Sequence, residues 1–136
     1  MGSAARCARS NAMNYQETLD GMLSAASGAS KGHWETLRGH AEIEFKRLSE
    51  TALGLEADYV SDMVAAHVET NAKERQAMER RAKRRMELAF ESLKLAAEGI
   101  VIAAKADARL AAQDAVNAAL AVLRTAINTS IGIAVL

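Results

Sequence analysis

Apolar residues recur at steps of three or four along most of the chain, which is the spacing of an amphipathic helix. The longest run predicts a helix over residues 33–70, and its apolar members are Trp34, Leu37, Ala41, Phe45, Leu48, Ala52, Leu55, Tyr59, Met63 and Ala66. A shorter run predicts a helix over residues 14–27, with the apolar members Tyr15, Leu19, Met22, Leu23 and Ala26. Two glycines and two serines in residues 27–32 predict a flexible connection between the two helices.

A third run follows Asn71, which stands three residues before Glu74, the spacing of a helix-capping pair. Its apolar stripe is Met78, Ala82, Met86, Ala89, Leu93, Ala96, Ile100, Ala104, Ala111, Ala115, Ala118 and Val122. The pattern predicts one nearly unbroken helix over residues 72–130, on the order of 80 Å long. A single rod that continues through Asn71 is the alternative, because Thr70, Asn71 and Ala72 do not forbid helix.

Composition strengthens the helical prediction. The 136 residues include no proline, and half of them are hydrophobic, so one all-α domain over residues 13–136 is expected. Residues 1–12 are small and polar and are predicted to be disordered. Ser10-Asn11-Ala12 before Met13 also resembles the remnant of a cleaved expression tag.

Charge is ordered along the chain, and this order favours an antiparallel hairpin of two long helices with coiled-coil-like packing. Residues 33–70 hold eight acids and three bases, whereas residues 71–87 hold seven bases and three acids. A fold-back near Asn71 sets these opposite charges side by side, whereas parallel rods would set like charges together. The expected pairs are Asp62 with Arg80, Asp58 with Arg84, and Glu56 with Arg85.

In that register the last third of the chain extends past the first long helix. Residues 108–136 are rich in apolar side chains, which a monomer would leave exposed, and large exposed apolar surfaces usually mark association sites. We therefore expect residues 108–136 to form a homo-oligomer interface, or to bind a protein partner, in an oligomeric helical bundle. The expected contact residues are Ala111, Ala115, Ala118, Leu120, Val122, Leu123, Ile127 and Ile131. The final six residues are expected to end as an extended strand or an apolar plug.

Two alternatives concern other partners. The basic block could contact nucleic acid through Arg80, Arg81, Lys83, Arg84 and Arg85, although zero net charge and the lack of interleaved aromatic residues favour a solvated face paired with the acidic helix. An amphipathic helix could instead adsorb to a membrane or granule surface. A transmembrane span over 116–136 is disfavoured, because a central Arg124 costs roughly 2.5–3.5 kcal/mol.

Residue patterns that perform catalysis or bind metal are not recognisable. Cys7 is the only cysteine, and no Glu lies three residues before any histidine as a di-iron bundle requires. His33, His40 and Glu44 share a helix face, with His40 and Glu44 as the best remaining catalytic pair. The sequence thus predicts no cofactor and a non-enzymatic structural, assembly or adaptor protein in the cytoplasm or in a virion. Its Ala-rich, long-helix composition resembles that of bacterial-virus scaffold proteins and of granule-coating proteins.

Overall fold

The computed structural model describes residues 13–132 and residue 136. Within these residues the chain is helical and contains no strand, which confirms the all-α prediction. The elements are α2 (Tyr15–Ala29), α3 (Trp34–His67), α4 (Ala72–Ala103), the short 3₁₀ helix η1 (Ala106–Ala108) and α5 (Arg109–Ile131). The prediction for residues 1–12 lies outside the described residues. Of the final six residues, expected to be extended or a plug, Ile131 instead ends α5 and Gly132 caps it, while 133–135 are not described.

Two of the helices begin at asparagine caps. The Asn14 side chain accepts a hydrogen bond from the Glu17 backbone N–H at 2.9 Å, and the Asn71 side chain accepts one from Glu74 at 3.0 Å. Each bond satisfies one of the N–H groups that a helix start leaves unpaired. The helix start predicted at Asn71 is therefore confirmed, and the alternative of a single rod through this residue is wrong.

The predicted unbroken helix over residues 72–130 is wrong. α4 ends at Ala103, because Ala104 and Lys105 adopt extended backbone conformations with ψ of 147° and 154°. The chain turns through η1 and returns as α5. Two helices of about 48 and 35 Å therefore replace the single 80 Å helix, and the C-terminal third lies against the rest of the molecule.

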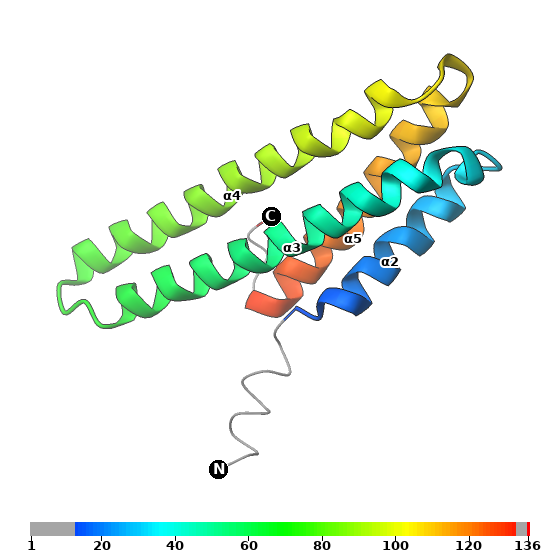
Figure 1. Cartoon of the computed structure of the whole chain (residues 1–136). Helices are drawn as coiled ribbons and strands as arrows, with labels where there is room; N and C mark the ends of the chain where they lie inside the picture. The colour runs from blue at the N-terminus through cyan, green and yellow to red at the C-terminus, as the bar shows by residue number, and fades with distance from the viewer. Residues whose placement is uncertain (1–12, 133–135) are drawn as a thin grey trace, which may run out of the picture.

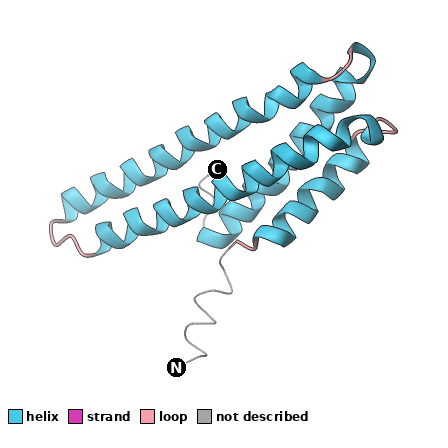
Figure 2. Cartoon of the chain, in the orientation of Figure 1, coloured by secondary structure: helices cyan, strands magenta, loops and turns pink. Residues whose placement is uncertain are grey.

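The four helices form a bundle at one end of an elongated molecule (Figure 1). α3 and α4 lie side by side along its whole length, and the shorter α2 and α5 cover part of them. Apart from the short η1, only turns and loops connect the helices (Figure 2). Small side chains fill much of the bundle centre, since Ala26, Ala41, Ala97, Ala112 and Ala119 are all buried. Such residues let helix backbones approach closely.

Glu56 marks the level at which the bundle ends. Its carboxylate accepts hydrogen bonds from the Met13 backbone N–H, at 2.9 Å, and from the Ser130 hydroxyl. Met13 immediately precedes the cap of α2, and Ser130 is in the last turn of α5. α3 continues for eleven more residues, and among the described helices only the first half of α4 lies beside it there (Figure 1). We call residues 57–85 the arm and the four-helix part the body.

Candidate interaction surfaces

The predicted oligomer interface lies largely inside the body. Ala115, Leu120, Leu123 and Ile127 are buried within the chain's own core, and Ala111, Ala118, Val122 and Ile131 are partly buried. α2 packs along α5, with α3 and α4 completing the contacts. The inference that a monomer leaves the C-terminal third exposed is therefore wrong. It failed because the turn after Ala103 was not predicted.

Among the described residues, one ion pair connects the acidic α3 with the basic part of α4, but not in the predicted pairing. Arg85 donates to both carboxylate oxygens of Asp62, at 3.1 and 3.3 Å. Arg80, Arg84 and Asp58 form no ion pair between α3 and α4 among the described residues, and Glu56 binds Met13 and Ser130 instead. The three predicted pairs are therefore wrong, although the two helices do meet through opposite charges at Asp62.

The direction of the side chains explains these mispairings. Ala82 and Met86 are the buried residues of α4 in this region, and they line a small cavity together with Tyr59 of α3. Arg80 and Arg84 each stand two positions from one of these buried residues, about 200° around the helix, so they point away from α3. Arg85 follows Ala82 by three positions and lies on the flank, within reach of Asp62.

The cations of α4 consequently form a basic edge on the arm, which we define as Lys73, Arg80, Lys83 and Arg84. All four are exposed. Within the part of the chain that the structure describes, Lys73, Arg80 and Lys83 form no ion pair, and Arg84 contacts only Glu87 of its own helix, at 3.5 Å. The neighbouring Arg81 contacts Glu74, also of α4, at 3.0 Å. The predicted shielding of the block by the acidic helix is thus limited to Arg85.

The opposite edge of the arm is apolar. Val60, Val64 and Val68 follow one another at steps of four and are 50%, 58% and 75% exposed. Val60 and Val64 each stand two positions from Asp62, which faces α4, so they point away from α4. Ala57 and Ser61 fill the adjacent positions, and they carry no charge. We call Val60, Val64 and Val68 the valine edge.

A second apolar stripe lies on the body. Leu88, Leu95 and Ile102 of α4 are seven residues apart and are 53%, 75% and 76% exposed. Charged residues flank this stripe on α4, namely Arg84, Glu91 and Glu98. Sequence reasoning missed both apolar edges, because it followed only the stripe that forms the core. The sequence signal that could have revealed them is a second series of branched apolar residues, spaced four or seven apart and offset from the core stripe.

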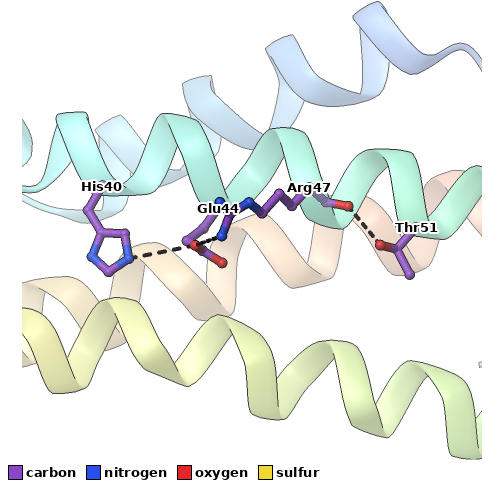
Figure 3. A network of polar contacts seen from close by, with 4 residues as sticks. All are labelled: His40, Glu44, Arg47 and Thr51. Carbon is purple, nitrogen blue, oxygen red and sulfur yellow. Dashed lines mark hydrogen bonds and ion pairs between the residues drawn. The ribbon is translucent and has the colours of Figure 1, made fainter.

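The catalytic candidates lie on α3 (Figure 3), where the His40 side chain is exposed and the Glu44 side chain is mostly covered. His40 Nε2 is 3.8 Å from Glu44 Oε1, and the same carboxylate oxygen accepts a hydrogen bond from Arg47 at 3.1 Å. Thr51 donates to the Arg47 backbone carbonyl. These are contacts within one helix. In the described part of the chain, no group of three or more histidine, cysteine or acidic residues is placed to hold a metal ion, so His33, His40 and Glu44 do not form such a cluster.

Two side chains have pKa values that depart from their ordinary range. On α3, a hydrogen bond to Glu42 at 2.8 Å, together with the charges of Glu42 and Glu35, raises the pKa of the exposed Arg38 guanidinium. In the arm, burial raises the pKa of Tyr59, and the nearby charge of Glu79 adds to this effect. The Tyr59 hydroxyl is buried, and it has no hydrogen-bond partner among the described residues.

Comparisons of the chain with protein-family models, with curated proteins and with solved structures gave no match. Among the described helices, none combines the length and the apolar character needed to cross a membrane. The two edges of the arm are therefore interpreted from their geometry and charge alone.

Proposed function

We propose that this chain is a non-enzymatic assembly or adaptor protein that self-associates through the valine edge of its arm. The observation that carries the proposal is an exposed, uncharged apolar edge on a part of the molecule that extends beyond its own bundle. The core residues of α5 are buried against other helices of the same chain, so we assign the contact between copies to α3 instead.

A second copy is the occupant that the charge pattern favours. In a two-fold antiparallel pairing, the valine edge of one copy contacts the valine edge of the other. Val64 then faces its own copy, and Val60 faces Val68, with no charged residue among the three positions. The basic edge of α4 would instead set Lys73, Arg80, Lys83 and Arg84 against the same cations, which is unfavourable.

The length of the arm also fits this pairing. When two α3 helices are centred on Val64, Glu56 of one copy lies at the level of residue 72 of the other. The body of each copy then begins just beyond the tip of the other arm. The arms overlap over their full length, and the bodies remain at opposite ends of the dimer. Because the part of α3 in each arm is only about three helical turns long, we expect association to be weak and concentration-dependent.

Sedimentation velocity over a range of protein concentrations tests the proposal. We expect the wild type to shift from monomer toward dimer with rising concentration, and Val64→Glu to remain a monomer, because the change sets two carboxylates against each other. Circular dichroism should show unchanged helix content in the variant, since Val64 is exposed.

Leu95→Glu is the matched control, because it introduces the same charge at an exposed apolar position of the body. It should dimerise like the wild type. A wild type that stays monomeric at every concentration would contradict the proposal, as would dissociation by Leu95→Glu but not by Val64→Glu.

A further inference from the structure

We propose that the basic edge of the arm binds the phosphate backbone of a nucleic acid duplex without reading its base sequence. This inference is independent of self-association, because it concerns α4 and leaves the valine edge free. It starts from the finding that the acidic helix neutralises one cation of the basic block rather than all of them.

The availability of the cations is the first step. Lys73, Arg80 and Lys83 have no carboxylate partner among the described residues. The side chains of Arg84 and Arg81 are exposed in their pairs with Glu87 and Glu74. Exposed ion pairs contribute little free energy, so a phosphate can replace the carboxylate at small cost. Five cations of one helix can therefore contact a polyanion.

Their arrangement is the second step. Lys73, Arg80 and Arg84 lie on the side of α4 that faces away from α3, spread over about 16 Å of helix. Of the carboxylates that α4 carries in the arm, Glu74 is bound to Arg81 and Glu79 is half-buried. Asp62 of α3 is bound to Arg85. One side of the arm thus presents positive charge at a spacing that spans several phosphates of a duplex. An α-helix also fits the width of the major groove of DNA.

The lack of apolar anchors favours nucleic acid over a lipid surface. Along the outward side of α4, the positions between Lys73 and Arg84 are occupied by Gln76, Ala77 and further charged residues. Helices that lie on membranes bury large apolar side chains beside their cations. The valines of the arm lie on α3 and at its C-cap, on the opposite edge, so they cannot insert while the basic edge contacts the headgroups.

Fluorescence anisotropy with a labelled, random-sequence DNA duplex tests this inference. We expect the wild type to bind, with an affinity that falls steeply as salt is raised. Removing three phosphate contacts by Lys73→Ala, Arg80→Ala and Lys83→Ala should lower the slope of log affinity against log salt by about 2.7. The three positions are exposed, so the fold should be unchanged.

The matched control removes Lys46, Lys105 and Arg109, which are also exposed and also comprise two lysines and one arginine. It changes the net charge equally, and it should keep the wild-type slope. Equal weakening by both triple variants would overturn the inference, because binding would then follow net charge alone. Failure of the wild type to bind the duplex at low salt would also overturn it, and so would binding to phosphatidylserine vesicles without binding to the duplex.

Discussion

Tyr59 places an unsatisfied polar group inside the arm. Its hydroxyl is buried and has no hydrogen-bond partner among the described residues. Because an unsatisfied buried polar group costs roughly 1–3 kcal/mol, Tyr59→Phe should leave stability unchanged or raise it by about 1 kcal/mol. Urea denaturation followed by circular dichroism measures this change. Tyr15→Phe is the control for loss of a hydroxyl from α2. A loss of more than about 1 kcal/mol in Tyr59→Phe would show that the hydroxyl is bonded after all.

The pH dependence of the same variant gives a second readout. Burial raises the Tyr59 pKa above its ordinary value of 10.0, so the folded state holds the phenolic proton more tightly than the unfolded chain does. The corresponding stability is present below pH 10 and is lost as the pH rises through the folded pKa. Wild type should therefore lose more stability than Tyr59→Phe above pH 10.

Glu56 shows how one residue can take a different role from the one that its charge predicts. Sequence reasoning assigned it to Arg85, because the acidic and basic thirds were expected to pair throughout. In the structure its carboxylate instead holds the start of α2 and the end of α5. Both contacts come from segments far away in sequence, and the second depends on the turn after Ala103. The pattern along α3 alone could not have predicted either contact.

Two helical glycines differ in the space around them, so replacing each by alanine distinguishes intrinsic helix propensity from packing between helices. Gly54 of α3 has open space where a Cβ would lie, whereas a Cβ on Gly21 of α2 would stand 3.1 Å from Val122 Cγ1 of α5. Gly54→Ala should stabilise the protein by about 0.5–1 kcal/mol, because alanine favours helix. Gly21→Ala should gain less, since Val122 must move. Thermal unfolding of the two variants compares them, and a larger gain at Gly21 would contradict the close packing of α2 on α5.

Helix starts with a polar cap were predictable from the sequence, whereas the break between α4 and α5 was not. Asn14 and Asn71 each place an amide three residues before a glutamate, and both cap helices. The chain between Ala103 and Arg109 contains neither proline nor glycine, and α5 begins without a side-chain cap. Ala104, Ala108 and Ala111 also keep the helical spacing across the break. The turn results from tertiary packing, which periodicity does not report.

The whole molecule divides into a four-helix body and a two-helix arm, and each part leaves some branched apolar residues exposed. The sequence predicted the surplus of apolar residues in the C-terminal third correctly, but the turn after Ala103 places Leu123 and Ile127 in the core. Most of the large apolar residues that remain exposed are branched residues of α3 and α4, offset from the core stripe, and Leu110 of α5 is exposed as well. The candidate surfaces were therefore predicted wrongly because the chain's turn was missed, and not because the apolar residues were misidentified.

Disulfide trapping between two copies of the arm tests the assignment of the self-association surface. In a Cys7→Ser background, Val64→Cys should form a covalent dimer under mild oxidation, because the antiparallel pairing brings residue 64 against its own copy. Leu95→Cys on the body, where residue 95 is more exposed than residue 64, should remain monomeric on a non-reducing gel. Efficient trapping through Leu95→Cys, with none through Val64→Cys, would contradict the proposed contact between arms.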